Sequence, residues 1–265
     1  MSFFDALVLG IVQGVTEFLP VSSSGHLVLA DALLGLEAPG VFVVLALHVA
    51  TLLSVCWVYR ARILALAGGM IRADATSWRY VGLLLLASIP AGLVGVTLMD
   101  VLAPMFDRPV VAAALLLVTG GIVSTMRVTV SRAARDRPGP LDAFAVGLAQ
   151  AVAVLPGISR SGSTVAVGTA LGVSAEHMAE FSFLMSVPAT AGAAVLEAPD
   201  LAAAGVQIGG APLIVAFLAA LVSGILAIRL FVRMIRHGTF HRFAYYCWAV
   251  GATYLLAAWL EPGLR

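Results

Sequence analysis

Long apolar stretches separated by short polar segments dominate the sequence. A helix that crosses a bilayer needs about 20 mostly apolar residues, and six stretches qualify: residues 40–59, 80–99, 109–125, 180–195, 212–232 and 243–260. The chain is 61% hydrophobic and only 11% charged, whereas a soluble domain of average composition carries about 25% charged residues. We therefore predict an all-α integral membrane protein with six transmembrane helices, forming a single membrane domain over residues 1–265.

Two further apolar regions are too short or too broken to cross. Residues 2–19 stop at Pro20 and a serine run, and residues 26–36 follow as a short apolar stretch. Residues 141–155 and 164–173 repeat this layout. Short apolar segments broken by Gly and Pro at corresponding places in two halves indicate hairpins that line a site at membrane mid-depth. We predict two such re-entrant helix-loop-helix hairpins.

The two hairpins also align in sequence. Gln13 and Gln150 are 137 positions apart, as are the Ser-Gly pairs that begin at Ser24 and Ser161. The same offset carries each of the first three predicted spans onto one of the last three. Each half therefore holds one hairpin and three spans, and because three is odd, the second copy starts on the opposite side of the membrane. We predict an inverted-topology repeat with copies at residues 1–130 and 138–265.

Arginines are concentrated in the connections after the first, third and fifth predicted spans. They are Arg60, Arg62, Arg72 and Arg79, then Arg127, Arg132, Arg135 and Arg137, and finally Arg233, Arg236 and Arg242. The positive-inside rule makes these connections cytoplasmic. Alternation through six spans then requires the first hairpin to open outward, the second to open inward, and both termini to lie outside.

Charge and cysteine usage exclude several classes. The net charge of +1 offers no basic field for nucleic acid. Cys56 and Cys247 are isolated in apolar runs without CxxC spacing, so we expect free thiols rather than a disulfide or a zinc site. The first residues lack the basic region and cleavage site of a signal peptide, so the first helix is expected to remain in the mature protein.

Candidate chemistry begins in the first hairpin. Gln13 and Glu17 are four residues apart and share a helix face just before the Pro20 break. An acidic residue in apolar surroundings is costly and usually faces a polar cavity, which favours a functional role for Glu17. The alternative is a structural carboxylate bonded to neighbouring serines.

The loop of the first hairpin adds hydroxyls and an imidazole. Ser22, Ser23 and Ser24 precede His26, which can act as a base or a nucleophile. The loop leads into a helix whose free N–H groups can bind an anion. For any single serine, helix capping is the alternative.

The second hairpin supplies Arg160, flanked by Ser159, Ser161 and Thr164. A guanidinium between two short helices suits bidentate phosphate recognition. The alternative is a structural ion pair with Glu17. The GK[ST] element of a Walker motif is absent, so this is not a nucleotide-binding loop of that kind.

Three segments, QGVTE at residues 13–17, PVSSSGH at 20–26 and PGISRSGST at 156–164, resemble the signatures of the undecaprenyl-diphosphate phosphatase family. Its signatures read [E/Q]xxxE, PxSSxGH and PGxSRSGxT. The family consists of integral enzymes of the bacterial inner membrane that act in the lipid carrier cycle of cell wall synthesis and are related to bacitracin resistance. The resemblance implies hydrolysis of undecaprenyl diphosphate to undecaprenyl phosphate and inorganic phosphate.

The resemblance also implies roles for individual residues. Glu17 would assist proton transfer or hold a divalent cation, Mg²⁺ or Ca²⁺. Ser23 would be the nucleophile or a phosphate ligand, His26 the base or a competing nucleophile, and Arg160 the phosphate clamp. The expected substrate ligands are Gln13, Ser22, Ser24, Ser159, Ser161 and Thr164. Many members have Glu where this chain has Gln13, which puts a role needing two carboxylates in doubt.

Two alternatives to an enzyme stay open at this level. Inverted repeats with broken helices are also the plan of transporters, so a transporter or lipid flippase is the rival class. A structural membrane protein is a more distant third. The expected partners are a polyprenyl diphosphate lipid and the bilayer, with a homodimer left open, in a multi-pass inner-membrane protein whose termini are periplasmic.

Overall fold

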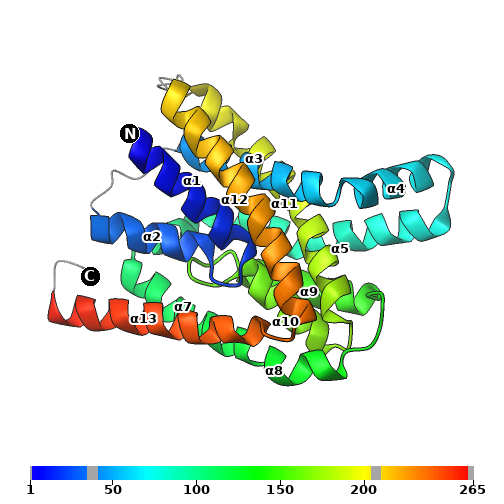
Figure 1. Ribbon diagram of the computed structural model, residues 1–265. Coiled ribbons are helices and arrows are strands. Elements are labelled where there is room, and N and C mark those ends of the chain that lie inside the picture. Colours follow the sequence, from blue (N-terminus) through cyan, green and yellow to red (C-terminus); the bar gives the residue numbers. More distant parts are fainter. Residues whose placement is uncertain (1, 35–40, 204–209, 262–265) are drawn as a thin grey trace.

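The computed structural model describes residues 2–34, 41–203 and 210–261 (Figure 1). Within these ranges the chain forms α-helices joined by turns and short 3₁₀ segments, and no β-strand. The all-α prediction is confirmed. Backbone polar groups are satisfied inside helices, as a lipid environment requires.

The two predicted helix-loop-helix segments form where the sequence indicated. The first consists of α1 (Phe3–Phe18) and α2 (Ser23–Leu34), and the second of α9 (Pro140–Val152) and α10 (Arg160–Ala170). Ser2 starts α1 through a reciprocal pair of hydrogen bonds with Asp5, and the helix ends just before Pro20. Proline at the first position starts α9, because its fixed φ suits a helix start and its missing N–H is not needed there.

Four helical segments are long and apolar enough to cross a membrane. They are α5 (Ala75–Thr97), residues Pro109–Arg132 beginning with α7 (Pro109–Ser124), α12 (Gly210–Arg236), and residues Phe240–Leu260 ending in α13 (Phe243–Leu260). A fifth candidate is α3 (Val41–Val58) taken with α4 (Arg60–Ile71), bent by 76° at their junction. The protein is therefore a multi-pass membrane protein.

The fourth predicted span, residues 180–195, is not confirmed. These residues lie inside α11 (Ala175–Ala203), a helix of 29 residues. In the described ranges, α11 is not one of the helices that are long and apolar enough to be candidate spans. The predicted first span, 40–59, coincides with α3 apart from its two ends: Gly40 lies outside the described residues, and Tyr59 lies between α3 and α4. Four or five membrane-capable helices are thus established.

Small residues bring the first hairpin close to its neighbour. Helix α1 packs along α12, where Gly10 faces the backbone of Ala216 and Gly14 faces Ser223 and the backbone of Ala220. A methyl group at either glycine would overlap these atoms. Such close approach is the usual way in which membrane helices gain packing contacts, because lipid gives them little hydrophobic drive to associate.

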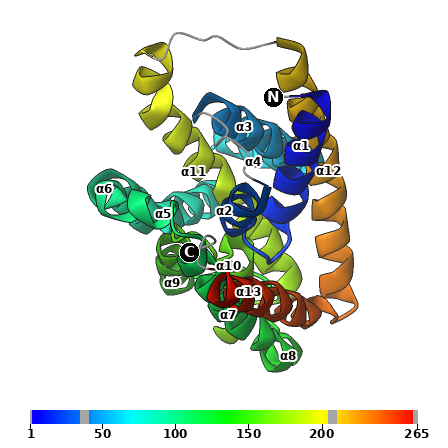
Figure 2. The same cartoon turned by 90° about the vertical axis from the view of Figure 1, so that its left-hand side faces the viewer.

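The pictures place the hairpins relative to the rest of the bundle. The N-terminal end of α1 and the C-terminal end of α13 lie on one side of the molecule (Figure 1). On the opposite side, α4 and the start of α5 form an arm that extends from the bundle. Seen from the first side, α2 and α10 lie toward the centre of the molecule, with α3, α11, α12 and α13 around them (Figure 2).

Candidate active site

The loops of the two hairpins are in direct contact, although 132 to 142 positions separate the groups that meet. Gly157 N donates to Ser22 Oγ over 3.2 Å, and Ser161 Oγ donates to the carbonyl of Leu19 over 3.2 Å. Gly25 packs so closely on the backbone of Gly157 that a side chain at residue 25 would overlap it. The sequence therefore brings its two motif segments together at one place.

Ser22 is a structural centre of this contact. Its φ of 67° lies in the left-handed region, which a residue other than glycine seldom adopts. Its buried hydroxyl accepts from Gly25 N (3.3 Å) as well as from Gly157 N, so it caps α2 and ties the loops together. The capping alternative is thus confirmed for Ser22, and its part in substrate binding stays a prediction.

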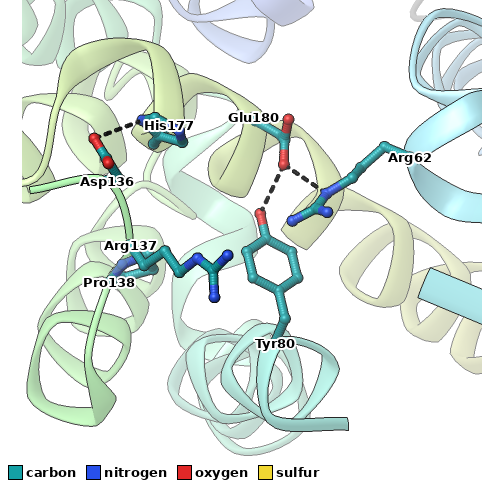
Figure 3. Close-up of a pocket in the computed structure, with 7 residues that line it drawn as sticks. All are labelled: Arg62, Tyr80, Asp136, Arg137, Pro138, His177 and Glu180. Atoms are coloured by element: carbon teal, nitrogen blue, oxygen red, sulfur yellow. Dashed lines mark hydrogen bonds and ion pairs between the residues drawn. The ribbon is translucent and has the colours of Figure 1, made fainter. Parts of the chain in front are cut away.

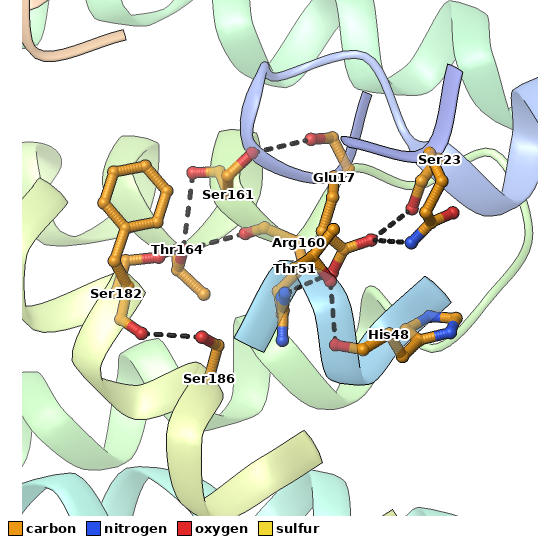
Figure 4. A network of polar contacts seen from close by, with 12 residues as sticks. Glu17, Ser23, His48, Thr51, Arg160, Ser161, Thr164, Ser182 and Ser186 are labelled. Carbon is orange, nitrogen blue, oxygen red and sulfur yellow. Dashed lines mark hydrogen bonds and ion pairs between the residues drawn. The ribbon is translucent and has the colours of Figure 1, made fainter. Parts of the chain in front are cut away.

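Glu17 stands at the centre of a polar cluster (Figure 4). One carboxylate oxygen accepts from Arg160 Nη2 over 2.5 Å. The other accepts from Ser23 Oγ (2.7 Å) and from Gln13 Nε2 (3.0 Å). The cluster joins α1, α2 and α10, and only 9% of the Glu17 side chain is exposed. The Glu17–Arg160 ion pair, raised from the sequence as an alternative, is present.

Arg160 retains donors for a second anion. The guanidinium carries five N–H groups, and only Nη2 is engaged, by Glu17, among the contacts of the described residues. Its side chain is 23% exposed, so the remaining face is accessible. Arg160 is also the first residue of α10, where the helix dipole favours negative charge. The predicted phosphate contact would use these other donors and so does not require Glu17 to be displaced.

Gln13 offers an oxygen beside Glu17. Its Nε2 group donates to Glu17, which fixes the amide orientation, and its Oε1 atom is buried without a hydrogen-bond partner in the described structure. Hard divalent cations prefer oxygen ligands of this kind. In the described part of the chain, no three His, Cys, Asp or Glu side chains cluster. The oxygen donors of Glu17 and Gln13 fit Mg²⁺ or Ca²⁺ better than a transition metal.

His26 is held on both ring nitrogens. Nδ1 lies 2.8 Å from the carbonyl of Ser22, and Nε2 lies 2.8 Å from the hydroxyl of Tyr246 on α13. The two rings are stacked, with centroids 5.6 Å apart. Because a carbonyl only accepts, Nδ1 carries the proton, and Nε2 of the neutral ring accepts from Tyr246. Tyr246 was missed by sequence reasoning, because nothing distinguishes it from Tyr245 in the same apolar segment.

The two candidate nucleophiles have different partners. Ser23 donates to Glu17, whereas His26 contacts Ser22 and Tyr246. Within the described residues no hydrogen bond joins Ser23 to His26. The carboxylate, not the imidazole, is therefore the base within reach of the Ser23 hydroxyl.

The hydroxyl groups of the remaining predicted ligands form hydrogen bonds with other groups of the protein. Ser159 caps α10 by accepting from Gly162 N (3.2 Å), and its hydroxyl is 3.3 Å from that of Ser161. Thr164 donates to the carbonyl of Arg160 and lies 2.6 Å from Ser182 Oγ. Ser24 Oγ is 3.3 Å from Ser22 Oγ. The substrate-binding roles of these four hydroxyls, Ser24, Ser159, Ser161 and Thr164, stay predictions.

Thr119 was also missed. Its buried hydroxyl donates to the carbonyl of Gly157 (2.7 Å) and accepts from Ser159 N (3.0 Å). It thereby fixes the second loop, where Gly157 has a φ of 98°. A single threonine in an apolar span carries no signal that would have revealed this contact.

Comparison with known proteins identifies the family. The model of the family described as Bacitracin resistance protein BacA matches residues 6–253. The chain belongs to the BacA family. This BacA match includes both hairpins and therefore every member of the Glu17 cluster.

Curated relatives of this BacA chain are named Undecaprenyl-diphosphatase. The protein of Desulfatibacillum aliphaticivorans is 39% identical, over 97% of this chain and 99% of the relative. That of Bacteroides fragilis is 38% identical, over 98% of this chain and all of the relative. That of Methanobrevibacter smithii is 37% identical, over 95% and 96%. The similarity thus extends over essentially the full length of each pair.

Proposed function

We propose that this protein removes the terminal phosphate of undecaprenyl diphosphate, yielding undecaprenyl phosphate and inorganic phosphate. The observation that carries the proposal is the Glu17 cluster, which pairs a base with a serine beside an arginine, in a chain whose full-length relatives are named Undecaprenyl-diphosphatase. This activity belongs to the lipid carrier cycle of the bacterial cell wall. The transporter alternative is not favoured by the comparisons.

The chemistry follows from the contacts of Ser23. Glu17 takes the proton of the Ser23 hydroxyl, which it already accepts over 2.7 Å, and the oxygen attacks the terminal phosphorus. The bond from phosphorus to the bridging oxygen breaks, and undecaprenyl phosphate leaves with the electron pair. Glu17 then releases this proton to solvent and takes a proton from water, whose oxygen attacks the phosphoserine. The bond from Ser23 Oγ to phosphorus breaks, Glu17 returns the proton to Ser23, and inorganic phosphate leaves. Arg160 stabilises the charge that develops on the phosphoryl oxygens.

We assign Tyr246 as a positioning residue for His26. The Tyr246 hydroxyl and the Ser22 carbonyl hold the ring in one orientation and one tautomer. Attack by His26 itself would require Nε2 to give up its bond to Tyr246, which favours Ser23 as the nucleophile. His26 remains available to donate a proton to the leaving oxygen once the ring is protonated.

The same site is proposed to hold one divalent cation, Mg²⁺ or Ca²⁺. Glu17 and the partner-free oxygen of Gln13 are the ligands that the chain offers. A bound cation would supply charge neutralisation for the diphosphate. Because Gln13 is a neutral amide, the negative charge at this site comes from Glu17 alone.

The proposed membrane arrangement has six spans and two re-entrant hairpins in an inverted repeat, with copies at residues 1–130 and 138–265. The 137-residue offset supports it, as does the length of α11, whose 29 residues would reach about 44 Å and can supply the sixth span. Both termini are proposed to lie outside the bacterial inner membrane. The polyprenyl tail would stay between helices in lipid while the diphosphate reaches Glu17.

Phosphate release by the purified protein tests this function. Given undecaprenyl diphosphate in detergent with Mg²⁺, wild type should release inorganic phosphate and Glu17→Gln should not. Lipid binding or translocation without phosphate release would favour the transporter class instead.

A further inference from the structure

A second polar site lies between the α4–α5 arm and the linker that precedes α9. A cavity of about 790 Å³ opens there, and Arg62, Tyr80 and Arg137 also line an adjoining cavity of about 280 Å³ (Figure 3). The larger volume is within the range of about 300–1,000 Å³ that is typical of small-ligand sites. None of the residues used in the proposed catalytic cluster lines either cavity.

Five arginines line the larger cavity: Arg62, Arg72, Arg79, Arg135 and Arg137. Two of them are neutralised. Arg62 forms an ion pair with Glu180 at 2.9 Å, and Arg135 binds Asp142 through two hydrogen bonds of 2.8 and 3.0 Å. Glu180 and Asp142 are thus already paired with Arg62 and Arg135.

The other three, Arg72, Arg79 and Arg137, have no carboxylate partner among the described residues. Asp74 lines the same cavity, but its carboxylate accepts from Thr76 N, Ser77 N and Ser77 Oγ. Asp136 lies 4.0 Å from His177 instead. The cavity therefore gathers three exposed and unpaired positive charges.

The positive-inside rule alone does not explain this arrangement. It requires arginines in the connecting segments, but it does not require them to share a cavity. Here Arg72 comes from the α4–α5 connection, Arg79 from the start of α5, and Arg137 from the linker before α9. The repulsion between like charges that converge without ion-pair partners is relieved by a bound anion, and guanidinium groups bind phosphate bidentately.

We propose that this cavity binds the phosphate group of an anionic membrane lipid. Exposed apolar side chains within two positions of lining residues favour a lipid over free phosphate. Leu64 and Ile71 on α4 are 70% and 87% exposed, and Leu141 at the start of α9 is 86% exposed. The acyl chains would lie against such residues while the headgroup phosphate contacts the arginines.

Lipid retention by the full-length protein tests the proposal. Native mass spectrometry would measure binding of phosphatidylglycerol to wild type and to a cavity variant, Arg72→Gln with Arg79→Gln and Arg137→Gln. The matched control combines Arg127→Gln, Arg132→Gln and Arg242→Gln, which removes the same charge outside the cavity. We expect the cavity variant to bind the lipid about tenfold or more weakly, as the loss of a charge-assisted contact implies, and the control to bind like wild type.

The other outcomes are decisive as well. Equal loss in both triple variants, or full retention in the cavity variant, overturns the proposal. Binding of inorganic phosphate that depends on the three arginines, without lipid retention, upholds a phosphate site but overturns the lipid as its source. Phosphatase activity should be unchanged in the cavity variant, which checks folding independently of the proposed function; if folding fails, Arg79→Gln and Arg137→Gln are compared singly.

Discussion

The Arg160 side chain forms an ion pair with Glu17 and keeps further N–H donors for the proposed phosphate contact. Lysine keeps the charge but not the planar fork, so it cannot serve both partners. We expect Arg160→Lys to lower kcat/KM by an amount corresponding to about 2–3 kcal/mol of transition-state stabilisation. Steady-state phosphate release measures this, with Arg127→Lys as control. Turnover close to wild type would make Arg160 purely structural.

Tyr246 gives a second residue-scale prediction. Tyr246→Phe removes one hydrogen bond to His26, worth about 1 kcal/mol, and leaves the stacked ring in place. We expect kcat to fall roughly fivefold and the pH profile of kcat to shift, because the histidine loses its fixed partner. Tyr245→Phe, in the neighbouring exposed residue, should change neither. An unchanged pH profile in Tyr246→Phe would show that the contact only supports packing.

The sequence motifs pointed to the charged candidate site residues, but not to the residues whose hydrogen bonds position the two loops. Glu17 and Arg160 were recognisable because charged groups are rare in apolar sequence. Tyr246 and Thr119 were not, since their contacts depend on how α13 and α7 pack against the hairpins. Gln13 is predicted from the sequence as a ligand, but its partner-free oxygen is visible only in the structure.

At the scale of elements, Arg135 closes the open end of the second hairpin. It donates to Asp142 at the start of α9 and to the carbonyl of Leu171 at the end of α10. Hydrogen bonds from Arg135, and then from Gly139 N, hold the pKa of Asp142 below its usual value. A lowered carboxyl pKa stabilises the fold above the pKa of the unfolded chain, about 4, and this stabilisation is lost as the pH falls through the folded-state pKa.

Asp142→Asn should therefore lower the Tm most above pH of about 4. The difference from wild type should shrink as the pH falls below that value, because the wild-type carboxylate becomes protonated. Thermal unfolding in detergent at a series of pH values measures the Tm of wild type and variant. Asp100→Asn, at an exposed position, is the control. A difference that does not depend on pH would contradict a charge-based role.

Sequence periodicity located the elements well but not all of their lengths. The hairpins were found because Pro20 and the Pro156-Gly157 pair interrupt apolar runs. The 76° bend between α3 and α4 was not foreseen. It lies at Tyr59, just before Arg60, where the apolar run of α3 gives way to arginines. The extent of α11 was underestimated, because residues 196–203 include Pro199 and charged side chains that seemed to end a span.

For the whole molecule, the inverted repeat predicts where each connection lies. Arginine-rich segments 60–79 and 127–137 should be cytoplasmic and both termini outside, since positive charge is retained inside. Single cysteines placed near residues 2, 74, 131 and 261 of a cysteine-free variant would be labelled in intact cells. The terminal positions should react with a membrane-impermeant reagent and the other two should not. Termini that react only after permeabilisation would contradict the inverted arrangement.

The central claim is that Ser23, activated by Glu17, attacks the terminal phosphate. Rapid acid quench of a single turnover, followed by peptide mapping, tests it most directly. The account predicts an acid-stable phosphoserine at Ser23, lost in Ser23→Ala together with turnover, whereas His26→Ala, which leaves the Glu17 base in place, keeps part of its activity. An acid-labile phosphohistidine at His26, or substantial turnover in both alanine variants, would contradict it; the second result would point to water activated by Glu17.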